Sequence, residues 1–177
     1  SRDGGQTFEL IDGSPTDPHR IAISGSGKLY VADWGKGIWR YDVASGKADG
    51  FNDQEAKKDI AVSYGTDGKV VALGHDFLKV STDHGDTWRT ISKEQGNLEL
   101  VTKNVHKGDF FTHSNTVSLH PDGKRAMVGN VYKVFESPDV FADTVTFVVI
   151  PEGVDSKAVN AFACPPKDER GLAAALY

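Results

Sequence analysis

The sequence of 177 residues is short of several residue types, and each shortage excludes a class of protein. A single cysteine, Cys164, cannot build a disulfide framework or a multi-cysteine metal site. No apolar run approaches the roughly 20 residues that a membrane-spanning helix needs. Positive charge is scarce too, because 20 Lys and Arg face 25 Asp and Glu, giving a net charge of -5. We therefore expect neither a membrane nor a nucleic acid as partner.

Familiar catalytic signatures are also absent. The six histidines show no H-E-x-x-H pattern and no paired spacing, so we expect no metal and no other cofactor. There is no G-x-S-x-G nucleophile elbow and no P-loop. Cys164 lies among small apolar residues, which predicts a core position and not a nucleophile.

What the sequence does contain is a series of short strand-like segments rich in β-branched and aromatic residues. Examples are 20–24, 28–32 and 37–41, each bounded by turn residues. The one helical candidate, 53–58, is too short to carry a domain. With 38% hydrophobic and 25% charged residues, the pattern predicts a globular, all-β antiparallel meander.

The meander repeats a strand, a Gly-Lys turn and a second strand. Copies span 21–31, 60–71 and 117–128, and a looser copy covers 161–174. Gly27 and Gly68 are separated by roughly the 40 residues that a four-stranded propeller blade needs. The longer interval to the third copy leaves room for a loop insertion.

A second motif, S-x-D-x-G-x-T-[FW], occurs at 1–8 and 81–88. This is the Asp box, a hairpin turn between the third and fourth strands of a blade. Its Asp can cap backbone amides, its Gly can take a positive φ, and its aromatic residue can pack between sheets. A degenerate copy spans 137–147, and a plainer turn at 42–47 occupies the same place. The motif predicts the fold, but it lies away from the chemistry.

Together these repeats predict an all-β propeller with about three complete four-stranded blades. The blades span about 19–52, 59–92 and 115–150, with partial units at 1–12 and 158–177 and a fourth strand at 7–11. Propellers typically close with 4–8 blades, and open sheet edges favour aggregation. We therefore expect a fragment that is completed by more of its parent chain or by a partner chain, and that is inactive alone.

Successive turns of a meander alternate between the two ends of a blade, so the Asp boxes and Gly-Lys turns should share one end. The opposite end carries the loops between second and third strands and the links between blades. We call it the ligand face, because propeller ligand sites usually lie there. The residues expected on it are Asp33, Trp34, Lys36, His75, Asp76, Asp17, His19, His106, Phe110, Phe111, His113, Asn130 and Asp155.

Trp34 beside Asp33 is a candidate sugar site, since an indole stacks on a pyranose and a carboxylate accepts bonds from hydroxyls. Packing between blades is the alternative for Trp34. Trp39 lies within a strand and Trp88 completes an Asp box, so both are predicted to pack in the interior. His75 and Asp76 form either an acid–base pair or a solvated loop.

Three stretches together resemble glycoside hydrolase family 74, the xyloglucan-cleaving enzymes built from two seven-bladed Asp-box propellers. They are the Asp box at 1–8, the P-H…G-x-L-Y…G-x-W-x-Y-D run at 18–42, and the segment 150–177. The degraded third Asp box and the short loop around Trp34 depart from the family pattern. An allied β-1,4-glucan or another plant polysaccharide is therefore an alternative substrate.

The resemblance implies a secreted enzyme that hydrolyses its polysaccharide with inversion, using a general acid and a general base in a cleft. Neither acid maps onto this sequence, because one belongs to an earlier part of the family's chain and the other would follow Tyr177. The predicted substrate-binding residues are Asp33, Trp34, His75, Asp76 and His19.

Two other functions stay open. The first is a non-catalytic Asp-box scaffold that binds a glycan or a protein. The second is a sialidase-like enzyme, although the sequence has no F-R-I-P segment to begin an arginine triad.

Overall fold

The computed structural model describes residues 1, 3–55, 57–63, 66–75, 77–92, 98–101, 114–130, 134–150, 159–163 and 173–176. These residues form strands and turns without a helix, so none of them belongs to a helix that could cross a membrane. The strands are β1 (Pro18–Ile23), β2 (Lys28–Asp33), β3 (Gly37–Asp42), β4 (Lys47–Asp53), β5 (Lys57–Val62), β6 (Val70–Gly74), β7 (Phe77–Ser81), β8 (Arg89–Ser92), β9 (Leu98–Val101), β10 (Ser114–Leu119), β11 (Ala126–Asn130), β12 (Val134–Ser137), β13 (Val145–Val149), β14 (Val159–Ala163) and β15 (Ala173–Leu176).

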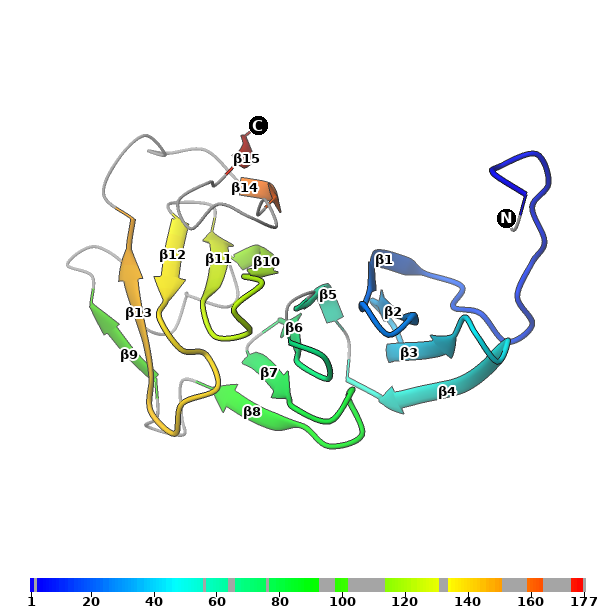
Figure 1. Cartoon of the computed structure of the whole chain (residues 1–177). Helices are drawn as coiled ribbons and strands as arrows, with labels where there is room; N and C mark the ends of the chain where they lie inside the picture. Colours follow the sequence, from blue (N-terminus) through cyan, green and yellow to red (C-terminus); the bar gives the residue numbers. More distant parts are fainter. Residues whose placement is uncertain are drawn as a thin grey trace.

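The strands pair as successive antiparallel meanders. Strands β1 to β4 form the first sheet, β5 to β8 the second and β10 to β13 the third, and β14 pairs with β15. The first strands of these units lie beside one another in the order β1, β5, β10, β14 (Figure 1). This is how blades surround a propeller axis, so the predicted all-β propeller fold, present in part, is confirmed.

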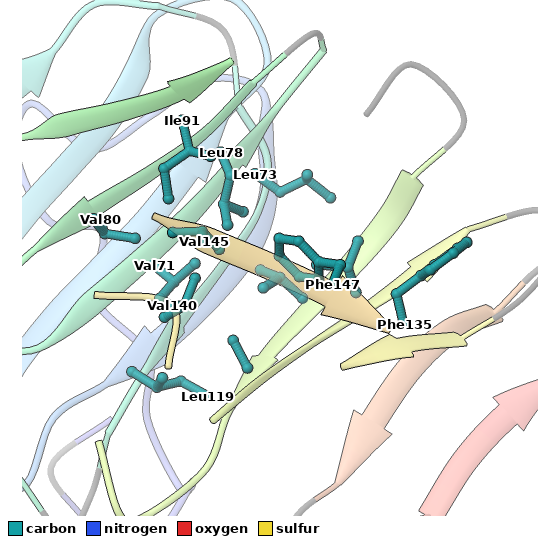
Figure 2. Packing of buried hydrophobic residues seen from close by; sticks show 13 residues of the cluster. Val71, Leu73, Leu78, Val80, Ile91, Leu119, Phe135, Val140, Val145 and Phe147 are labelled. Atoms are coloured by element: carbon teal, nitrogen blue, oxygen red, sulfur yellow. The ribbon is translucent and has the colours of Figure 1, made fainter. Parts of the chain in front are cut away.

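The hydrophobic core lies between the sheets, because side chains alternate between the two faces of each strand. Tyr30 and Ala32 pack on Ile60, Val70 and Ala72 of the second sheet, whereas the intervening residues point the other way. The other face of the second sheet meets the third sheet (Figure 2) in a cluster that contains Val71, Leu73, Leu78, Val80, Ile91, Val117, Leu119, Ala126, Val128, Phe135, Val140, Val145 and Phe147. At about 1.5–3 kcal/mol for each large apolar side chain, this burial makes neighbouring sheets mutually dependent.

The outward face of the first sheet carries its own apolar cluster. Val31, Trp39 and Tyr41 are buried there, and the Trp39 and Tyr41 rings stack 5.8 Å apart. Trp39 is 1% exposed, which confirms its predicted core position. Ile11 packs against this cluster from the N-terminal segment.

Both intact S-x-D-x-G-x-T turns are closed by the same hydrogen bonds. In the second turn, Thr87 donates from its hydroxyl to Asp83 Oδ2 (2.6 Å) and from its amide to Oδ1 (2.9 Å). Ser81 donates to Asp83 Oδ1 (2.7 Å) and accepts from the amide of Gly85 (2.8 Å). Ser1, Asp3, Gly5 and Thr7 repeat this arrangement. The turn therefore forms from local contacts wherever the motif is intact.

The degenerate copy closes differently. Asp139 Oδ1 accepts from the amide of Phe141 (3.0 Å), the residue that stands where the intact motif has glycine. That amide therefore does not donate to Ser137, and the buried Ser137 hydroxyl has no hydrogen-bond partner among the described residues. The turn still joins β12 to β13, because Val140 and Val145 are fully buried in the core.

Three local expectations differ from the structure. Residues 7–11 are not a strand, because a strand needs a neighbour and no described strand lies beside them. The described residues of the helical candidate 53–58 do not form a helix, because β4 ends at Asp53 and β5 begins at Lys57. The interval before the third unit contains β9, which pairs in parallel with β13.

Candidate functional site

The two ends of the blades can be told apart by their turns. The amide of His84 donates to Gly68 O (2.9 Å), and that of Val140 donates to Lys124 O (3.0 Å). These bonds tie the turns between third and fourth strands to the Gly-Lys turns, so the two kinds of turn share one end as predicted. The ligand face is the opposite end, and its described parts are the β2–β3 turn, the segment before β1, residues 54 and 55 after β4, and His75 after β6.

Asp33 ends β2 and lies beneath the turn, with only 1% of its surface exposed. Its Oδ1 accepts from the amides of Gly35 (2.9 Å) and Lys36 (2.7 Å), and its Oδ2 accepts from the amide of Asp17 (3.1 Å). The carboxylate therefore fixes the turn and ties it to the segment before β1. It is not on the surface where a sugar hydroxyl would meet it.

Trp34 lies at the tip of the same turn and is 39% exposed. Its amide donates to Asp17 O (3.2 Å), and its ring stacks on His19 with centroids 5.4 Å apart and planes 20° apart. The structure thus brings two predicted binding residues together. His19 supports the indole, which suits an aromatic platform held in one orientation.

A small depression lies beside this turn. It has a volume of about 220 Å³ and is lined by Gly35, Lys36, Phe51 and Gln54. The Lys36 ammonium lies 5.8 Å from the centre of the Phe51 ring. Sequence reasoning missed Phe51 and Gln54, because they lie on β4 and the link after it. The only signal was the position of that link on the ligand face.

Gly37 holds the turn against the link between the first two sheets. Its φ is 104°, a region that favours glycine, and a Cβ there would overlap the carbonyl of Asp53. The turn and the link are therefore in backbone contact, which fixes the mouth of the depression.

The carboxylates of the link are engaged by a lysine from the second sheet. Lys79 Nζ contacts Asp53 Oδ2 (2.8 Å) and Glu55 Oε2 (2.5 Å). Burial opposes the lysine's charge, but hydrogen bonds to these two carboxylates outweigh it and raise the pKa of Lys79. Asp53 also accepts from the amide of Glu55 (3.0 Å). This cluster therefore holds two sheets together and is not a free acid–base pair.

A second buried carboxylate joins the inner strands. Asp59 on β5 is 4% exposed and accepts from the Thr116 hydroxyl (2.7 Å) and the Val117 amide (2.9 Å) of β10. Burial raises the pKa of Asp59, although these bonds and Arg20 at 3.8 Å act against the rise. A raised pKa can mark a functional acid, but this carboxylate faces the interior and links two sheets. An Asp directly before the apolar residues 60–62 of the strand was its signal in the sequence.

His75 lies in the β6–β7 turn of the neighbouring sheet and is exposed. Asp76 lies outside the described residues, as do His106, Phe110, Phe111, His113 and Asp155, so the structure does not place the His75–Asp76 pair. Among the described residues, no group of three or more His, Cys, Asp or Glu side chains could hold a metal ion.

The fold and its loops define a class, the β-propellers. No family model and no curated protein matches the sequence. Solved structures do match in fold. The GH74 enzyme of Niastella koreensis has a TM-score of 0.69 over 92% of this chain at 18% identity. The GH74 xyloglucanase of Xanthomonas campestris has a TM-score of 0.70 over 99% at 17% identity.

The β-propeller domain of Cps50 (Swd1) from Myceliophteria thermophila also matches, with a TM-score of 0.64 over 92% of this chain at 8% identity. This chain spans 28% and 29% of the two GH74 chains and 50% of the Cps50 chain. At these identities the likeness shows the propeller fold. It does not by itself assign an activity.

Proposed function

We propose that this chain is part of a secreted Asp-box propeller that hydrolyses xyloglucan or a related β-1,4-glucan with inversion, and that its described residues bind the substrate. The observation that carries the proposal is the exposed Trp34 ring, stacked on His19 at the ligand face. The sequence resemblance to glycoside hydrolase family 74 and the GH74 enzymes among the fold neighbours support it.

The described residues suit binding better than proton transfer. An indole stacked on His19 presents an apolar surface to a pyranose ring, whose C–H bonds pack on the aromatic face. Asp33 acts indirectly, because its three hydrogen bonds to backbone amides set the position of Trp34. His75 would extend the binding surface onto the next sheet.

The test compares Trp34→Ala with Trp34→Phe in the purified protein, using calorimetric titration with a xyloglucan heptasaccharide. Aromatic stacking and lost apolar area together amount to about 1.4 kcal/mol, so W34A should bind about tenfold more weakly. W34F keeps a flat ring and should recover part of the affinity. Equal affinity of W34A and the unchanged protein would contradict the proposal.

A second candidate is a non-catalytic propeller that binds a glycan. The observation favouring it is that Asp33, Asp53 and Glu55 on the ligand face are engaged by amides or by Lys79, so none of them is free to act with the exposed Asp17 as an acid–base pair. Release of reducing ends from xyloglucan by the intact protein distinguishes the two. Binding without release would favour the scaffold.

A sialidase-like function would need a cluster of arginines. Arg40 pairs with Asp49 and Asp86, and Arg125 pairs with Asp122 in a Gly-Lys turn, so both lie toward the end opposite the ligand face. Arg89 donates to Val140 O in the turn between β12 and β13, at the same end. Among the described arginines, Arg20 on β1 is then the one beside the ligand-face residue His19.

A further inference from the structure

The depression beside Trp34 differs from its surroundings in charge. Of its lining residues Gly35, Lys36, Phe51 and Gln54, only Lys36 is ionised. Among the described residues Lys36 has no carboxylate partner, and its one described side-chain contact is the Phe51 ring at 5.8 Å. That distance is close to the roughly 6 Å limit of a cation–π contact, so the ammonium is weakly held.

Nearby carboxylates do not neutralise this ammonium. Asp33 is buried with three backbone amides on its oxygens, Asp53 and Glu55 share Lys79, and the exposed Asp17 makes no described ion pair with Lys36. Among the side chains that the structure describes around the depression, Lys36 is therefore the cation that no carboxylate pairs with. It projects from the turn that also presents Trp34.

The size of the depression limits what it can hold. Its volume of about 220 Å³ lies below the roughly 300–1,000 Å³ of pockets that enclose drug-sized ligands. The volume of a single sugar unit of a longer glycan is of the same order as that of the depression. Phe51 offers an aromatic surface to such a unit, and Gln54 offers an amide that can donate to and accept from hydroxyls.

We infer that this depression is a subsite for a carboxylate-bearing sugar, a uronic acid unit, whose carboxylate pairs with Lys36. This inference rests on the proposed glycan-binding function and adds that the bound glycan carries uronic acid units beside its neutral units. Trp34, which belongs to the same turn, would stack on a neighbouring unit of the same glycan. A neutral glycan would leave the Lys36 charge without a partner.

The test uses trigalacturonate and cellotriose as probes in calorimetric titrations of the purified protein at low salt. Lys36→Met removes the charge and keeps the length of the side chain. Lys47→Met is the matched control, because Lys47 is exposed at the start of β4, toward the opposite end of the blade. Matching thermal unfolding of the three proteins would show that each is folded.

The unchanged protein should bind trigalacturonate more tightly than cellotriose. Because an exposed ion pair contributes modestly, K36M should weaken trigalacturonate binding up to about fivefold and leave cellotriose binding unchanged. K47M should bind both like the unchanged protein. Salt at about 300 mM should reduce the preference for trigalacturonate, since exposed charges are then screened.

Equal binding of the two probes by the unchanged protein would overturn the inference, and so would equal loss in K36M and K47M. Binding of cellotriose alone would overturn the acidic subsite while leaving the glycan-binding function intact. Binding of neither probe would count against both.

Discussion

Replacing Asp33 by alanine tests whether this residue holds the β2–β3 turn or contacts the glycan. The substitution removes an acceptor from three amides, those of Asp17, Gly35 and Lys36, at 2.7–3.1 Å. Hydrogen bonds to a charged group contribute about 1.5–3 kcal/mol each when the donors stay buried. Here the turn is at the surface, where water can replace part of the hydrogen bonding that the three amides lose.

The closer comparison is the loss of a helix N-cap, which costs about 0.5–2 kcal/mol. With three amides affected and the carboxylate only 1% exposed, we expect D33A to lower the free energy of unfolding by about 2–3 kcal/mol. Urea unfolding followed by tryptophan fluorescence measures this difference. Asp33→Asn should lose less, because one oxygen remains to accept from Gly35 and Lys36.

The two variants also separate stability from binding. If Asp33 only holds the turn, D33N should bind a xyloglucan heptasaccharide almost as well as the unchanged protein under folding conditions. A change in unfolding free energy below about 0.5 kcal/mol for D33A, the range of ordinary surface substitutions, would refute the structural role. Loss of glycan binding in a stable D33N would instead show direct contact.

Two further predictions concern backbone geometry and pH. Gly37→Ala should cost more than about 3 kcal/mol or prevent folding, whereas Gly27→Ala, which has a positive φ but open space, should cost about 1 kcal/mol in thermal unfolding. Hydrogen bonds, first from the Thr87 side chain, lower the pKa of Asp83 from 3.8 to about 2. Its stabilisation should therefore be complete above about pH 4 and be lost as the pH falls toward 2. Asp83→Asn should flatten the acid-unfolding profile between about pH 4 and pH 2. An unchanged profile would contradict the stabilising role of the Asp83 carboxylate.

The fold could be predicted because its determinants are local and repeated. The turn around Asp83 is closed by hydrogen bonds among the serine, aspartate, glycine and threonine of its own motif, so the motif alone predicts the structure of the turn. A strand is different, since residues 7–11 have strand composition but no described neighbour to pair with. The strand β9 was missed for the converse reason, because its pairing with β13 is long-range.

The candidate site could be predicted only in part. The sequence placed His19, Asp33 and Trp34 at one end of a blade, and the structure brings His19 and Trp34 into contact. It gave no sign that Asp33 points inward, since that depends on amides from two separate segments. Phe51 was likewise missed, because it lies on β4 and the position of that strand beside the turn depends on packing.

The chemistry open to the described ligand face follows from which of its charges are already engaged. Proton transfer needs a carboxyl group within hydrogen-bond reach of the reacting bond. Asp33 is committed to amides, and Asp53 and Glu55 are committed to Lys79, which leaves the exposed Asp17. What these loops do offer is the Trp34 ring and the Lys36 ammonium, which serve recognition of a glycan. For the described residues we therefore argue a binding role, because hydrolysis with inversion needs a pair of carboxyl groups and at least one of them would come from other residues of the protein.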